Sequence, residues 1–77
     1  MASLVYFKKV SEQPGSICYS FGEDPEEMTR HLTMDTATLT STPDDGHIDY
    51  AYLKASRKIN SVFSERSQWP ERGMSVS

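Results

Sequence analysis

The sequence predicts an α+β fold: an antiparallel meander of three to four β-strands with one C-terminal amphipathic helix packed on one face, in the order β-β-β-α. Three observations predict it. Residues 4–22 contain two β-branched and aromatic segments around a Pro-Gly turn. Residues 29–35 alternate apolar and polar side chains, and residues 44–68 repeat apolar ones with a period of 3.6. Because an isolated hairpin is unstable in water, the helix is expected to cover the strands.

The first two strands are expected at residues 4–10 and 16–22, joined by the intervening loop into an antiparallel hairpin. The second strand alternates strictly, which puts its isoleucine, tyrosine and phenylalanine on one face. A register with Phe7 opposite Tyr19 brings the apolar side chains of both strands onto the same face. The sequence therefore predicts one buried and one open face for this sheet.

Residues 23–35 admit two interpretations. An Asp-Pro pair followed by glutamate is typical of a helix start, which allows a short helix over residues 25–32. The period of two in residues 29–35, together with their threonines, favours a turn followed by a third strand, and this is our prediction. Residues 36–42 are small and polar, and we expect either a fourth, edge strand or a loop there.

The helix is the longest periodic element, and Asp44 or Asp45 is expected to cap its N-terminus. It should end before Pro70, because the residue that precedes a proline is driven out of helical geometry. We therefore expect a single domain over residues 1–69 and a disordered polar tail over residues 70–77. The predicted buried face of the helix consists of Ile48, Ala51, Tyr52, Ala55, Ile59, Val62 and Phe63.

The chain has 77 residues, enough for one domain with a modest core, and only 36% of them are apolar. Such a core leaves little margin over the conformational entropy of the chain, so we expect a modestly stable monomer or a homodimer. There is one cysteine, no apolar run reaches the ~18 residues of a membrane span, and the N-terminus does not resemble a signal peptide. These features predict a cytoplasmic protein without a membrane partner.

Several acidic side chains and a histidine lie between Asp44 and Asp49, which raises the question of a metal site. This segment lacks a second histidine or a cysteine, and it lacks the bidentate glutamate of a calcium loop. A turn and a helix cap account for these residues. The four glycines are too far apart to form a phosphate-binding loop. We expect no metal, no cofactor and no catalytic residue, and we predict that the protein is not an enzyme.

Cys18 and His31 are the other side chains with reactive chemistry, and both are expected on the open face of the sheet. In the predicted register Cys18 lies beside Lys8, whose charge would lower the pKa of the thiol. No Cys-x-x-Cys motif accompanies Cys18, and His31 has no expected partner for acid–base work. We interpret both as ordinary strand residues.

Two surfaces are expected to carry partner contacts. The open face of the sheet combines tyrosine, lysine and histidine, and the outer side of the helix carries a Tyr-Leu-Arg triplet at i, i+3 and i+7. The candidate contact residues are Tyr6, Lys8, His31, Tyr50, Leu53 and Arg57.

The sequence favours a non-catalytic cytoplasmic protein-interaction module, monomeric or homodimeric. The first alternative is an acidic inhibitor or antitoxin-like protein that masks a basic site on a partner through Glu23, Asp24, Glu26 and Glu27. The second is a weak nucleic-acid binder that uses the basic residues of the helix. The acidic middle of the chain and the net charge of −3 disfavour this second alternative. Its candidate residues are Lys54, Arg57, Lys58 and Arg66.

Overall fold

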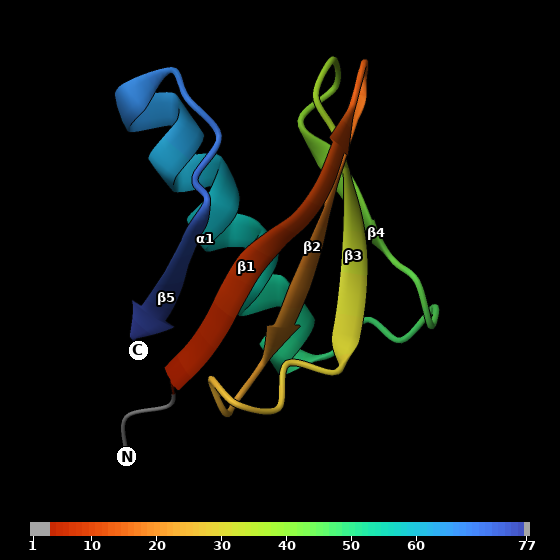
Figure 1. Ribbon diagram of the computed structural model, residues 1–77, viewed down its shortest axis with the longest axis vertical. Coiled ribbons are helices and arrows are strands. Elements are labelled where there is room, and N and C mark those ends of the chain that lie inside the picture. The colour runs from red at the N-terminus through yellow and green to blue at the C-terminus, as the bar shows by residue number, and fades with distance from the viewer. Residues whose placement is uncertain (1–3, 77) are drawn as a thin grey trace.

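The computed structural model describes residues 4–76, which form one five-stranded antiparallel sheet and one helix (Figure 1). Along the sheet the strand order is β4-β3-β2-β1-β5. The α+β prediction is confirmed, with one more strand than expected. The elements are β1 (Leu4–Gln13), β2 (Ser16–Gly22), β3 (Arg30–Asp35), β4 (Thr40–Pro43), α1 (Tyr50–Arg66) and β5 (Arg72–Val76).

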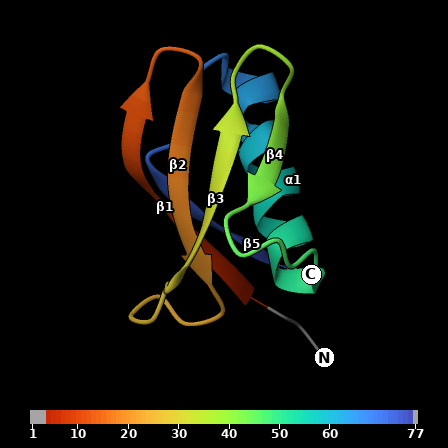
Figure 2. The same cartoon turned by 90° about the vertical axis from the view of Figure 1, so that its right-hand side faces the viewer.

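The helix α1 lies across one face of the sheet and leaves the other face open (Figure 2). Alternate residues of β1, β2 and β3 point toward α1, as the period of two predicts. The apolar side chains between the two layers are buried, which confirms the predicted two-layer core. The buried core residues are Val5, Phe7, Ile17, Tyr19, Phe21, Leu32, Met34, Ala51, Tyr52, Ala55 and Ile59.

The register predicted for the hairpin is wrong, although its faces are right. Phe7 pairs with Phe21 and not with Tyr19, because the turn is shorter than predicted, which moves the register by three residues, and a β-bulge at Val10 moves it back by one. The strands also continue to a two-residue turn, where Gly15 adopts a φ of 89°. The predicted and observed partners of Phe7 are two residues apart, so the same apolar side chains still face α1.

The segment after β2 forms a turn and then the strand β3, so the predicted turn and strand are confirmed and the short helix over residues 25–32 is excluded. The Glu27 amide donates to the Asp24 carbonyl, N to O 3.0 Å, which closes the turn. Of residues 36–42, only those from Thr40 onward join the sheet, as the edge strand β4.

The helix starts later than predicted. Its N-cap is Asp49, whose carboxylate accepts from the Tyr52 amide at 3.0 Å, and not Asp44 or Asp45. The residues before Asp49 instead form a β-turn that contains Gly46, whose φ is 73°. Ile48 therefore lies before the helix and is 67% exposed, so its predicted place in the core is wrong.

The prediction of a disordered tail is also wrong for the residues that the structure describes, because β5 pairs antiparallel with β1. The Trp69 ring stacks on Phe63 at 4.0 Å between centroids, and the Tyr19 hydroxyl donates to the Pro70 carbonyl at 2.7 Å. These contacts return the chain to the sheet after α1. Residues 1–3 of the predicted domain and residue 77 of the predicted tail lie outside the described residues.

Candidate functional site

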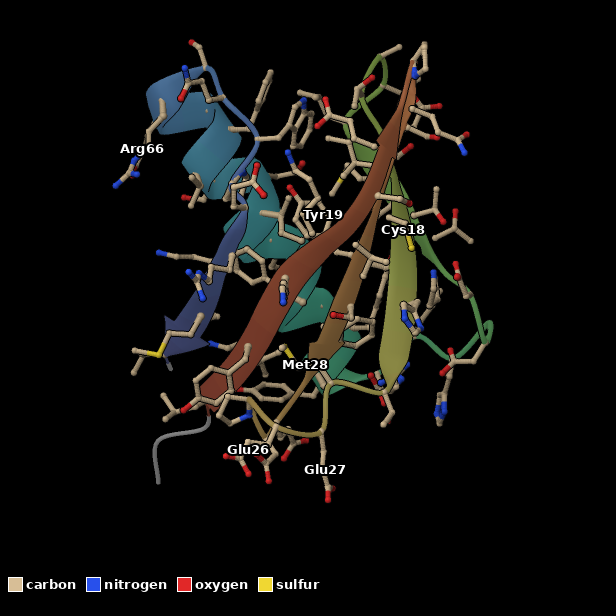
Figure 3. The ribbon with its side chains drawn as sticks, in the orientation of Figure 1. Cys18, Tyr19, Glu26, Glu27, Met28 and Arg66 are labelled. Atoms are coloured by element: carbon tan, nitrogen blue, oxygen red, sulfur yellow. The ribbon has the colours of Figure 1, made fainter. Side chains whose placement is uncertain are left out.

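The open face of the sheet carries a groove of about 430 Å³, bounded by β1, β5 and the loop between β2 and β3. Each of these three segments contributes two exposed or half-buried side chains to it. The loop brings its methionine over the end of the sheet, where Figure 3 labels Met28. These side chains are Tyr6, Lys8, Pro25, Met28, Arg72 and Met74, and Phe7 and Gly73 also line the groove.

Gly22 lets the loop approach the sheet this closely. A Cβ atom on Gly22 would lie 2.9 Å from the Glu27 carbonyl oxygen and 3.2 Å from the Met28 Cα, both of them backbone atoms. Gly22 is also the strand partner of Tyr6, so the absent side chain leaves room beside the tyrosine. The loop can therefore form one wall of the groove.

The lining separates into an apolar row and a cationic row across the strands. Tyr6 of β1 pairs with Met74 of β5, and Lys8 of β1 pairs with Arg72 of β5. Met74 is 45% exposed, which is a large apolar area to leave in contact with water. The groove thus offers apolar contact at one end and two positive charges at the other.

The two positive charges have no ion-pair partner among the described residues. Neither Lys8 nor Arg72 forms an ion pair with any residue between 4 and 76. Like charges directly opposite each other on a sheet are destabilising. An anionic group bound between the two side chains would relieve this repulsion.

The predicted contact residues divide between two surfaces. Tyr6 and Lys8 line the groove, and His31 lies on the same face in the cross-strand row of Lys8, with Ser20 of β2 between them. Sequence reasoning missed four exposed or half-buried side chains of the lining, those of Pro25, Met28, Arg72 and Met74. The alternation of large and small residues along 72–76 was the available signal for β5, because it is the period of a strand.

The helix surface is separate from the groove, because α1 covers the opposite face of the sheet. Tyr50 and Leu53 are 52% and 37% exposed, and Arg57 is exposed as well. The ammonium of Lys54 lies 5.7 Å from the centroid of the Tyr50 ring, a cation–π distance. None of the three residues of this triplet lines the groove.

Cys18 does not lie beside Lys8, so that part of the sequence analysis is wrong. Lys8 pairs with Ser20, and Cys18 lies farther along β2, opposite Ser11. Burial raises the pKa of the Cys18 thiol, and the negative charge of Asp44 raises this pKa further. The local environment therefore opposes thiolate formation.

The acidic cluster before the helix binds a guanidinium. Arg30 of β3 donates to Asp45 at 2.9 Å and to Asp49 at 2.7 Å, and these bonds hold the pKa of both carboxyls below their usual range. Among residues 4–76, no group of three or more His, Cys, Asp or Glu side chains is placed to hold a metal ion. The cluster thus joins β3 to the start of α1.

The two charged sets named in the alternatives lie on different elements, the acidic set on the loop between β2 and β3 and the basic set along α1. Figure 3 shows Glu26 and Glu27 pointing away from the sheet at one end, and Arg66 at the far end of α1. All four acidic side chains of the loop between β2 and β3 are exposed. Three of the four basic helix residues are exposed and Lys54 is half-buried, which leaves most of this charge in water.

No family model, curated protein or solved structure matches this chain. Within residues 4–76, no helix combines the length and the apolar composition that crossing a membrane requires.

Proposed function

We propose that this protein is a small, non-catalytic interaction module that binds another protein through the groove on the open face of its sheet. The observation that carries the proposal is the composition of the groove, in which exposed apolar side chains lie beside two cations that form no ion pair within residues 4–76. Apolar surface bordered by charged side chains is typical of protein–protein contact surfaces.

The size of the groove also supports a peptide-like partner. At about 430 Å³ it can accept a few side chains, and β5, an edge strand of the sheet, forms one side of it. Methionine side chains are flexible and polarisable, so Met28 and Met74 can adapt to the partner that they contact. Cytoplasmic location and the choice between monomer and homodimer remain predictions from the sequence.

The test is affinity capture from an extract of the native source, with two matched variants. Met74→Asp puts a charge into the groove, and Leu53→Asp puts the same charge on the outer side of the helix. Both positions are exposed, so both variants should keep the circular dichroism spectrum and thermal midpoint of the wild type. We expect the same partner with the wild type and with Leu53→Asp, and its loss with Met74→Asp.

If Met74→Asp still captures the partner and Leu53→Asp does not, the helix surface is the contact surface. Capture of the same partner by both variants, or no capture by the wild type, would contradict the proposal.

A second candidate function is favoured by the exposure of the acidic loop, which fits an inhibitor that masks a basic site on an enzyme. Under this alternative the captured partner is basic, and replacing Glu26 and Glu27 by glutamine abolishes capture. Capture that survives this double replacement would exclude the inhibitor and leave the groove as the contact surface.

A further inference from the structure

The outer edge of β5 carries backbone groups that pair with no strand within residues 4–76. Within residues 4–76 no strand pairs with this edge, and Figure 1 shows β5 at the margin of the sheet beside β1. The Lys9 amide donates to the Glu71 carbonyl, N to O 2.7 Å, so the adjacent Lys8–Arg72 pair is of the non-hydrogen-bonded kind. The amide and carbonyl of Arg72 therefore point away from β1, and by alternation so do those of Met74.

The same residues supply the groove with side chains. Arg72 and Met74 line the groove, and Val76, the next residue of this alternation, is 60% exposed. One set of residues thus presents free hydrogen-bonding groups to the side and open side-chain positions to the face. A strand that pairs with β5 would place every second side chain against this face.

The charge and polarity of the residues on β5 indicate which side chains the added strand would carry. Opposite Arg72, next to Lys8, an acidic side chain would be favoured, and opposite Met74 and Val76 an apolar one. The acidic loop of residues 23–27 lies beyond the Tyr6 end of the groove and disfavours a second acid there. An antiparallel partner is expected, because antiparallel pairing is the more stable kind.

We propose that β5 binds an extended segment of the partner protein as an added antiparallel strand. From its N-terminus to its C-terminus, this segment reads apolar, any residue, apolar, any residue, acidic, with the last position opposite Arg72. The inference rests on the proposed function and adds the conformation, direction and chemistry of the partner.

The test uses a short synthetic peptide with this pattern, threonine at the unspecified positions, added to the full ¹⁵N-labelled chain. Hydrogen exchange at the outward-pointing amides of Met74 and Val76 should slow when the peptide is added. The amides of Gly73 and Ser75 point toward β1 and should change little. This alternation distinguishes strand addition from contact of side chains alone.

N-methylation of the peptide supplies a matched backbone control. In the proposed register the central apolar residue exchanges both hydrogen bonds with Met74, so methylating its nitrogen should abolish binding. The threonine next to it points its amide away from β5, and methylating that nitrogen should leave the affinity nearly unchanged. Equal effects of the two methyl groups would overturn the inference.

A charge exchange tests the acidic position. Arg72→Glu should weaken binding of the acidic peptide by about tenfold or more, and a peptide with lysine at that position should regain the affinity. Arg57→Glu, on the helix, is the matched control and should leave the affinity of both peptides unchanged. Failure of the lysine peptide to recover binding to the Arg72→Glu variant would count against the proposed register.

Other occupants of the edge would be detected in the same samples. A dimer by light scattering, with exchange at Met74 that slows as protein concentration rises, would show that a second copy fills the edge and would overturn the inference. Absence of peptide binding up to about 1 mM would also overturn it. In either case the proposed function is judged separately, by whether Met74→Asp loses the native partner.

Discussion

The two edges of the sheet are built differently. At β4, the Tyr52 hydroxyl donates to the Ser41 carbonyl at 2.7 Å, the Ser41 and Ser56 hydroxyls lie 2.7 Å apart, and the Asn60 amide donates to the Leu39 carbonyl at 3.0 Å. Figure 2 shows β4 lying against α1, which supplies these groups. The strand ends at Pro43, which has no amide proton to offer.

At β5, in contrast, the helix side chains make no such bonds to the strand among residues 4–76. Its sequence contains no proline and no bulge interrupts its pairing with β1. Natural sheets protect their edges with short strands, prolines, bulges or covering elements, because an open edge pairs with other chains. The difference teaches that side chains of α1 cover the edge at β4, whereas within residues 4–76 the edge at β5 has no such cover.

The largest expected effect comes from removing β5 from the sheet. A Cβ atom on Gly73 would lie 2.8 Å from Cζ of Phe7, whose ring is fully packed in the core. Gly73→Val should therefore displace β5 and lower the free energy of unfolding by about 1–3 kcal/mol. Chemical denaturation measures the loss, and hydrogen exchange should become fast along β5 but not along β4.

Met74→Val is the control for that change, because it adds the same side chain to the same strand on the open face. It should leave the free energy of unfolding within about 0.5 kcal/mol of the wild type. Equal stability of Gly73→Val and the wild type would show that β5 does not depend on contact with Phe7.

A smaller effect is expected from opening the protected edge. Tyr52→Phe removes the hydroxyl that binds Ser41 and should cost about 1–1.5 kcal/mol, with faster hydrogen exchange in β4. Tyr19→Phe is the matched variant at the other side, because its hydroxyl binds the Pro70 carbonyl before β5. In the Tyr19→Phe variant, hydrogen exchange should become faster in residues 67–76. A uniform increase across the sheet in either variant would contradict the separate anchoring of the two edges.

The smallest expected effect concerns pH, and it belongs to the β4 side. Arg30 lowers the pKa of Asp49, so this carboxylate stabilises the fold above the ordinary aspartate value, and the contribution is lost as pH falls through the lowered value. Asp49→Asn keeps a good N-cap but removes the charge. Between about pH 5 and pH 2, its thermal midpoint should fall less than that of the wild type.

Glu23→Gln removes an exposed acid outside the Arg30 cluster and serves as the control for the pH measurement. Its midpoint should follow the wild type more closely than that of Asp49→Asn. Parallel curves for the wild type and Asp49→Asn would show that the ion pair with Arg30 adds nothing to acid stability.

Much of the fold follows from local pattern. Alternation in β2 and β3 and the period of 3.6 in α1 identify which side chains are buried, because those periods match the geometry of the elements. Local pattern does not predict the β-bulge at Val10 or the cap at Asp49, because several neighbouring residues satisfy the same local rules. Their positions depend on contacts with distant residues, such as Arg30 with Asp49.

The candidate site follows from the sequence only in part. Tyr6 and Lys8 were predicted on the open face because they alternate with the buried residues of β1. Arg72 and Met74 lie more than sixty positions away along the chain, and only the pairing of β5 with β1 brings them to the same groove. No local rule specifies that pairing.

The sequence by itself determined that an apolar helix stripe covers a small antiparallel sheet, since burial of apolar surface needs only the pattern of side chains. The tertiary structure alone decided that the last described residues become a strand and which edge stays open. The physical reason is that a short polar segment gains too little from burial to form a strand alone. It becomes ordered only where β1 offers hydrogen bonds and Phe7 leaves room for Gly73.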